Sequence, residues 1–188
     1  MCIRDRTHTL ELVPALTRPD LLAAPVLAAL RGWAGEQPVA EIAVAEIDPE
    51  LADTAAFCDR YGVAPDASAN CVVVTGKRGG ETRYAACLVL ATTRADVNGA
   101  ARRHLDVRKA SFAATDVAVA ETGMEYGGIT PIGLPASWPV LVDTAVAEHP
   151  HVVIGSGVRR SKLWLPGAVL AGLPGIEVVP GLGRPAAG

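Results

Sequence analysis

The stretch "NCVVVTGKRGGETRYAACLVLA", from Asn70 to Ala91, decides how this chain folds. Two runs rich in apolar and β-branched residues flank the tetrapeptide "KRGG" at Lys77 to Gly80. Runs of this kind on either side of a glycine-containing turn are typical of a β-hairpin. The stretch therefore predicts two long antiparallel strands at the centre of the fold.

The segment before this hairpin predicts a helix, a strand and a second helix. Residues Pro19 to Ala34 have a helical pattern in which Pro25 starts or kinks the main part. "VAEIAVAEI", from Val39 to Ile47, alternates as a half-buried strand does. Asp48, followed by a proline, predicts the N-cap of a helix that ends near Gly62.

The segment after the hairpin contains more short strands than helices. Thr93 predicts the cap of a helix from Arg94 to His104, "KASFA" predicts a short strand, and Thr115 predicts the cap of a helix that stops at Gly123. Four strand-like runs follow, with short helical segments between them: "WPVLVD", "HVVIGSG", "SKLWLP" and "IEVVP".

Interleaved hairpins and helices predict a mixed α/β fold of the α+β type. We expect a single domain with a central, largely antiparallel sheet surrounded by helices. A length of 188 residues suits one domain. We assign residues 8–180 to the domain, residues 1–7 to a non-native or disordered leader that matches no element pattern, and residues 181–188 to a frayed tail.

Composition and charge narrow the classes of function. Apolar residues make up 50% of the chain and charged residues 20%, as in ordinary globular domains. The formal net charge of -3 gives no reason to expect non-specific binding to DNA or other nucleic acids. Basic residues nevertheless form two clusters, which are either solvated surface or a phosphate-contacting patch: Arg102, Arg103, Arg108 and Lys109, and then Arg159, Arg160 and Lys162.

The cysteines and the apolar runs predict a cytoplasmic protein. Cys2, Cys58, Cys71 and Cys87 form no C-x-x-C pair, and no histidine pair has zinc-ligand spacing, so we expect reduced thiols and no metal. The apolar run Leu21 to Leu30 is ten residues long and contains a proline, which is too short to span a bilayer. No signal peptide is recognisable, and no membrane partner is expected.

Common catalytic and cofactor motifs are absent from the sequence. There is no P-loop, no G-x-G-x-x-G after a strand, no G-x-S-x-G elbow and no H-E-x-x-H helix. These absences predict no cofactor. A Ser/His/Asp triad stays open, because sequence alone does not reveal which residues meet in space.

A second stretch, "TGMEYGGITPIGLP" from Thr122 to Pro135, is unusual in a different way. It contains four glycines and two prolines among apolar residues, whereas a disordered linker would be more polar. One interpretation is a loop that a ligand approaches closely, because glycine leaves the backbone uncovered. The other interpretation is a buried turn without a ligand.

In this order of elements the chain resembles the YbaK/EbsC family, the aminoacyl-tRNA editing domain that is also inserted in bacterial prolyl-tRNA synthetases. The resemblance rests on a G-x-x-x-P loop from Gly127 to Pro131 and on the preceding Thr122 and Gly123. The hairpin, the helix exit "VRKASFA" and the late glycine-rich turn "GSGVRR" add to it. The likeness covers roughly residues 48–170.

The resemblance implies a trans-acting deacylase that hydrolyses the ester of mischarged tRNA, with the acceptor end of the tRNA and an aminoacyl-tRNA synthetase as partners. Backbone N–H groups of the glycine loop would stabilise the negative charge that an ester carbonyl gains on attack by water or by a substrate group. The implied catalytic residues are Gly127, Gly128, Pro131 and Asn70. The implied substrate-binding residues are Thr122, Gly123, Ile129, Thr130, Asp143, Gly155, Ser156, Gly157 and Arg159. Asp143 and Ser156 are the weaker candidates among them, and the alternative for each is a turn or capping residue.

The sequence departs from the family at Asn70, where the pattern K-T-L-V usually begins with a lysine. The resemblance implies that this lysine holds the terminal nucleotide, and Asn70 can offer only a neutral hydrogen bond. Lys77 and Arg78, or Arg159 and Arg160, are candidates to supply the charge.

Two alternatives to a deacylase therefore stay open. One is a non-catalytic tRNA- or nucleotide-binding module of the same fold, and the other is an unrelated small-molecule binder on the same scaffold. In every case we expect the glycine loop at the mouth of a pocket beside Asn70. If tRNA binds, we expect both basic clusters on one face around that pocket.

Overall fold

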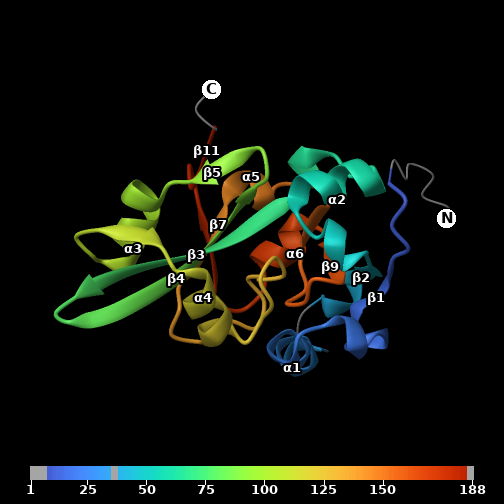
Figure 1. Cartoon of the computed structure of the whole chain (residues 1–188), viewed down its shortest axis with the longest axis horizontal. Coiled ribbons are helices and arrows are strands. Elements are labelled where there is room, and N and C mark those ends of the chain that lie inside the picture. The colour runs from blue at the N-terminus through green and yellow to red at the C-terminus, as the bar shows by residue number, and fades with distance from the viewer. Residues whose placement is uncertain (1–7, 35–37, 186–188) are drawn as a thin grey trace.

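A computed structural model describes residues 8–34 and 38–185 of the chain (Figure 1). The proposed leader, residues 1–7, lies outside the described residues. Strands form a five-stranded sheet in the order β10-β7-β4-β3-β6, a four-stranded sheet in the order β1-β2-β9-β8, and a small two-stranded pair of β11 and β5. The mixed α/β architecture predicted from the sequence is confirmed.

The five-stranded sheet is built around the predicted hairpin. Its strands β3 (Ala69–Arg78) and β4 (Glu81–Leu90) pair in antiparallel fashion, and the turn uses two glycines with positive φ, Gly79 and Gly80. One further strand is antiparallel to β3 and two are added in parallel beyond β4: β6 (Ala110–Phe112), β7 (Val140–Asp143) and β10 (Ile176–Val179).

The four-stranded sheet is antiparallel throughout. Its strands, in spatial order, are β1 (Val13–Pro14), β2 (Ala43–Glu46), β9 (Ser161–Leu165) and β8 (Val152–Gly155). This sheet meets the five-stranded sheet at the beginning of β3, where Ser68 bridges Val153. Antiparallel pairing therefore dominates across the domain, and the two sheets join beside Asn70.

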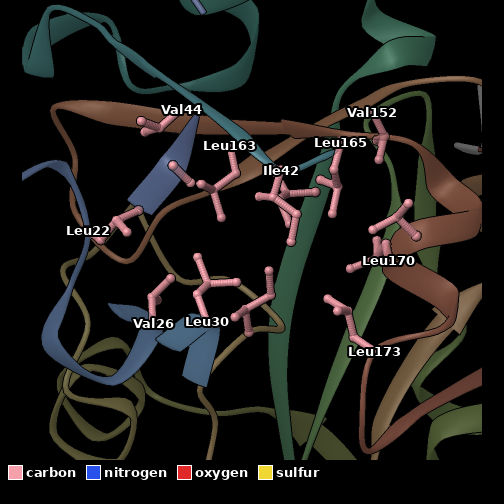
Figure 2. Close-up of a cluster of buried hydrophobic side chains, with 14 of the residues drawn as sticks. Leu22, Val26, Leu30, Ile42, Val44, Val152, Leu163, Leu165, Leu170 and Leu173 are labelled. Atoms are coloured by element: carbon pink, nitrogen blue, oxygen red, sulfur yellow. The ribbon is translucent and has the colours of Figure 1, made fainter. Parts of the chain in front are cut away.

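Short helices surround the sheets: α1 (Ala24–Trp33), α2 (Thr54–Tyr61), α3 (Arg102–Leu105), α4 (Thr115–Thr122), α5 (Thr144–Ala147) and α6 (Gly167–Ala171). Figure 2 shows the largest apolar cluster, in which side chains from α1, α6 and the four-stranded sheet point toward one another. Val26, Leu30, Ile42, Leu163 and Leu165 are at most 1% exposed. Burial of these side chains fixes the sheet that carries β8 and β9.

The predicted strand from Val39 to Ile47 is wrong over its first part. Val39–Glu41 forms a 3₁₀ turn, and β2 begins at Ala43. Val39 and Ile42 are both buried although they are three residues apart, because a 3₁₀ turn brings positions i and i+3 to one side. A turn of this kind cannot be separated from a strand by a short alternating pattern alone.

The helix predicted after Asp48 is divided in two. The Asp48 carboxylate accepts a hydrogen bond from the N–H of Glu50 at 2.9 Å, and this caps a 3₁₀ helix at Pro49–Leu51. Helix α2 then begins at Thr54 and ends, as predicted, at Gly62, whose φ is 68°. The break between the two helices places Asp53 and its neighbours beside β3.

The predicted cap at Thr93 is wrong. Thr93–Ala95 forms strand β5, and the Asp96 carboxylate accepts hydrogen bonds from the N–H groups of Gly99 and Ala100, each at 3.1 Å. A π-helical turn, Val97–Ala101, follows and leads into α3. Threonine and aspartate are both common caps, so local preference did not distinguish them.

The ends of two other segments also differ from expectation. Thr115 is the first residue of α4 and Ala114 occupies the cap position, although Gly123 ends the helix with φ 66° as predicted. The tail is not frayed over its first part, because β11 (Gly183–Pro185) pairs with β5. Pairing with a distant strand is not visible in the local sequence of the tail.

Candidate active site

A cavity of about 330 Å³ opens where the two sheets meet. Its walls come from four separate parts of the chain: the segment Ala52 to Thr54, the beginning of β3 from Ala69 to Val72, the loop from Tyr126 to Ile129, and the β8–β9 pair through Gly155 and Lys162. The size is at the lower end of the roughly 300–1,000 Å³ of typical ligand sites. As expected from the sequence, the glycine loop and Asn70 lie on the same cavity.

The two glycines of the loop are required for different reasons, Gly127 for its backbone conformation and Gly128 for close packing. Gly127 lines the cavity with φ 78°, a conformation that side chains rarely allow. Gly128 has no positive φ; a Cβ there would lie 2.7 Å from the backbone of Val158. Its carbonyl accepts a hydrogen bond from the N–H of Gly157 at 2.7 Å. The loop is thus both a cavity wall and a closely packed turn.

Arg159 holds this loop in place. Its guanidinium donates to the carbonyl oxygens of Tyr126 at 3.1 Å and Pro49 at 3.2 Å. Its backbone N–H donates to the Glu125 carboxylate at 2.6 Å. Arg159 therefore ties the glycine loop to the 3₁₀ helix before α2, while its guanidinium lies 5.8 Å from the centre of the Tyr126 ring.

Asn70 lies between two cavities. Its carboxamide oxygen accepts a hydrogen bond from the Thr54 hydroxyl at 2.7 Å. On the other side of this pair is a second cavity of about 520 Å³, lined by α2 residues, Val63, Pro65 and Ala91. The Asn70–Thr54 pair therefore forms a neutral polar partition between the two spaces.

Lys162 is a cavity residue that the sequence analysis placed in a surface cluster. It lies on β9 directly opposite Gly155, and its Nζ donates to the carbonyl oxygen of Ala52 at 3.0 Å. Burial lowers the pKa of the Lys162 amine to about 8, and the nearby Arg159 charge adds to this effect. A partly buried cation thus shares the cavity with Asn70.

The cavity also contains a thiol, on Cys71. Burial raises the pKa of the Cys71 thiol far above its usual range, so that the thiol stays protonated at neutral pH. No group of three potential metal-ligating side chains occurs in residues 8–34 and 38–185. Over the same ranges, no helix has the length and apolar character needed to cross a membrane.

The family comparison assigns the chain to a known group. The model of the aminoacyl-tRNA editing domain matches residues 48–173. The chain belongs to this family. The matched range contains the glycine loop, Asn70, Gly155 and Lys162, and it confirms the resemblance drawn from the sequence.

Solved structures agree with this fold. The editing domain is 21% identical to a proposed trans-editing enzyme for prolyl tRNA synthetase, with a TM-score of 0.69 and coverage of 84% of this chain and 94% of that one. It is 18% identical to the hypothetical protein APE2540, with a TM-score of 0.66 and coverage of 75% and 90%. A chain used in epitope backbone grafting by computational design is 22% identical, with a TM-score of 0.69 and coverage of 84% and 95%.

Two residues of the sequence-based site lie away from the cavity of the editing domain. The Asp143 carboxylate caps α5 by accepting from the N–H of Ala145 at 2.8 Å, and it also accepts from the N–H of Gly183. Ser156 is fully buried, and its hydroxyl lies 2.7 Å from that of Ser161. Both side chains are fully engaged in holding the fold.

The remaining residues of the predicted site stabilise the loop without lining the cavity. The Thr122 hydroxyl donates to the carbonyl of Ala118 at 2.7 Å at the end of α4, which Gly123 terminates. Thr130 and Pro131 are buried, and the Thr130 hydroxyl has no hydrogen-bond partner among the described residues. Gly157, with φ 87°, packs against Ala23. These residues shape the loop, whereas Gly127, Ile129 and Gly155 face the cavity.

The two basic clusters do not form one patch around the cavity. Arg102 and Arg103 belong to α3, whose end contacts the hairpin tip through hydrogen bonds from Arg78 and Arg83. Along β3, Asn70 and Arg78 are eight residue steps apart, which corresponds to roughly 26 Å. The second cluster is itself divided, because Arg160 donates to the carbonyl of Asp20 while Lys162 enters the cavity.

Proposed function

We propose that this editing domain is a trans-acting aminoacyl-tRNA deacylase, which hydrolyses the ester between a wrong amino acid and the 3′ end of a tRNA. The observation that carries the proposal is the cavity in which Gly127 and Ile129 face Asn70 across the junction of the sheets. Family membership supports the same class of reaction. An ester group fits this arrangement because its carbonyl oxygen gains negative charge during attack.

The loop offers backbone donors for that charge. Gly128 uses its N–H in a hydrogen bond to the Glu125 carbonyl at 2.9 Å. We therefore assign stabilisation of the oxyanion to the N–H groups of Gly127 and Ile129. The positive φ of Gly127 is part of this geometry, since it sets the orientation of the adjoining peptide groups.

The attacking group is best explained as water or a hydroxyl of the substrate. The Cys71 thiol stays protonated, and the Ser156 hydroxyl is completely buried beside Ser161. Neither side chain is therefore suited to form a covalent intermediate. Attack by an activated oxygen on an ester held against the loop requires no cofactor.

An exposed aromatic ring at the cavity supports binding of a nucleotide end. Tyr126 lines the cavity and is 61% exposed, which is unusual for a large apolar side chain. Exposed aromatic rings commonly stack on unpaired bases of single-stranded RNA. We assign the terminal base of the tRNA to this ring and the aminoacyl ester to the cavity beneath it.

The second candidate is a module that binds a tRNA end without hydrolysing the ester. Asn70 favours it, because this neutral side chain stands where the family pattern has a lysine. Under either function we place the protein in the cytoplasm, where mischarged tRNA and an aminoacyl-tRNA synthetase are its partners.

A deacylation screen separates the two candidates. Purified protein is incubated with a panel of mischarged tRNAs, beginning with tRNA(Pro) charged with cysteine or alanine, and the loss of aminoacyl-tRNA is followed. Turnover of at least one ester supports the deacylase. Tight binding of the same tRNAs without turnover of any ester supports the binding module, and neither binding nor turnover contradicts both.

A further inference from the structure

One basic side chain, Lys162, is found among the described residues that line the cavity. Its position follows from the pairing of β8 with β9, which sets Lys162 opposite Gly155. Since Gly155 has no side chain, the glycine loop can pack directly on the sheet next to Lys162. A Cβ at position 155 would lie 2.4 Å from the carbonyl oxygen of Gly128, so the glycine loop closes directly over this pair.

The amine of Lys162 is held in place by one hydrogen bond, which leaves part of its hydrogen-bonding capacity unused. Its Nζ donates to the carbonyl oxygen of Ala52 at 3.0 Å, which anchors the side chain against the segment before α2. An ammonium group has three donors. One donor is used by Ala52, and the Nζ also lies 5.5 Å from the centre of the buried Phe57 ring. The remaining hydrogen-bonding capacity of the amine is available to a ligand in the cavity.

We propose that Lys162 binds an anionic oxygen of the ligand in this cavity and supplies the positive charge that Asn70 cannot. The inference rests on the proposed function for the identity of the ligand, the acceptor end of a tRNA. It assigns the charged contact to β9, which contributes a different part of the cavity wall from β3.

The surroundings of Lys162 contain one cation, Arg159, and one carboxylate, Asp53, which also lines the cavity. Burial and the Arg159 charge lower the pKa of the amine, whereas Cys58 and Asp53 act in the opposite direction. At about 8, this pKa leaves most of the amine protonated at neutral pH. A cation in a partly desolvated site forms a stronger charge-assisted contact than an exposed one.

The acceptor end offers two possible partners for Lys162, the terminal phosphate and the ester carbonyl oxygen, which is negative only during attack, and the two predict different kinetics. If Lys162 contacts the phosphate of the terminal nucleotide, its loss raises KM and leaves kcat nearly unchanged. If it contacts the ester oxygen that becomes negative during attack, its loss lowers kcat instead.

The experiment compares four variants with the wild type. Lys162→Met removes the charge, Lys162→Arg keeps it, and the double variant Lys162→Met with Asn70→Lys moves it to β3. Lys109→Met is the matched control, because Lys109 is an exposed lysine far from the cavity. Folding of each variant is checked by thermal unfolding. The measurements are kcat and KM on the best ester of the tRNA panel, and the affinity for adenosine 5′-monophosphate.

We expect Lys162→Met to lose roughly tenfold or more in kcat/KM or in nucleotide affinity. Lys162→Arg and the double variant should recover part of this loss, and Lys109→Met should resemble the wild type. If Lys162→Met is folded and equals the wild type in both assays, the proposal is overturned. If the wild type hydrolyses no ester, the proposed function fails, and the nucleotide affinities still decide whether Lys162 binds an anion.

Discussion

The two ends of strand β3 carry positive charge in contrasting environments. At the cavity end, Lys162 is half-buried, and burial shifts its pKa downward. At the hairpin tip, Arg78 pairs with Asp106, and the two side chains are 55% and 63% exposed. Water and salt screen the second kind of pair, so its contribution is small. Burial, rather than the number of clustered basic residues, therefore indicates where a charge can act on a ligand.

The largest effect is expected on stability, from adding a side chain at Gly155, where the glycine loop packs on β8. In Gly155→Ala the new Cβ would lie 2.4 Å from Gly128 O and 2.7 Å from Ile129 O, which are both backbone atoms. We expect the free energy of unfolding to fall by about 2–3 kcal/mol. Urea unfolding measures this change. Gly32→Ala, in α1 with open space around it, should instead raise stability by about 0.5–1 kcal/mol. Equal stability of the two variants would contradict the tight contact.

The next effect concerns activity at the glycine loop. Gly127 and Gly175 have the same φ of 78°, but Gly175 has nothing within 4 Å of its would-be Cβ and lies away from the cavity. The positive φ should cost alanine about 1 kcal/mol of stability at either position, and at Gly127 the new Cβ would in addition displace the flexible Arg159 guanidinium. We expect Gly127→Ala alone to lower the deacylation rate by at least about tenfold. Similar deacylation rates for the two variants on mischarged tRNA would show that the glycine loop does not take part in catalysis.

A smaller effect on kcat/KM is expected from pH, through the titration of Lys162. The pKa of Lys162 is held at about 8 against an ordinary value of 10.5, so the amine loses its charge in the folded protein as pH rises through 8. The kcat/KM of the wild type, relative to that of Lys162→Arg, should therefore decline between pH 7 and 9. A constant ratio over this range would indicate that the Lys162 charge is not used.

The same titration has the opposite sign for stability. Below pH 8 the amine is charged in both the folded and the unfolded chain, and the cost of burying the charge is complete. Between the folded and unfolded pKa values the unfolded chain binds more protons, so the free energy of unfolding rises with pH. Any stability advantage of Lys162→Met over the wild type should narrow above pH 8, as unfolding in urea at several pH values can determine.

The smallest effect is expected at the hairpin tip. Arg78→Gln removes an exposed ion pair, and Arg103→Gln removes an exposed charge from α3. Each should change the free energy of unfolding by less than about 1 kcal/mol and leave kcat/KM unchanged. Assays at low and moderate salt test this expectation. A clear loss of tRNA affinity in either variant would mean that the tip also contacts the tRNA.

Much of the fold was predictable because its signals are local. The hairpin is marked by long apolar runs around "KRGG", and helix ends are marked by glycines such as Gly62 and Gly123, which adopt positive φ. The cap of the segment after β4 was wrongly placed at Thr93 because Asp96, three residues later, offers the same kind of oxygen acceptor. Competition between similar local signals accounts for such errors.

From local sequence patterns the candidate site was predictable only within one segment, whereas Asn70 and Gly155 followed from the family resemblance. Gly127 and Ile129 follow from the composition of their own loop. Lys162 reaches the cavity because β9 pairs with β8 and β8 adjoins β3, and no local pattern in "SKLWL" reveals that arrangement. Alternation did contain a partial signal, since Ser161, Leu163 and Leu165 are buried and Lys162 lies on the other face.

The junction of the two sheets affects how sharply the domain can distinguish amino acids of different size. A continuous hydrogen-bond ladder holds neighbouring strands about 4.7–4.9 Å apart. Across the described residues, a single bridge, between Ser68 and Val153, joins the sheets. Side-chain packing therefore sets most of the distance between the sheets at this junction. A junction held by packing deforms more easily than a continuous hydrogen-bond ladder. We expect amino acids of increasing bulk to be hydrolysed with gradually decreasing efficiency, without the sharp cut-off of a rigid sieve.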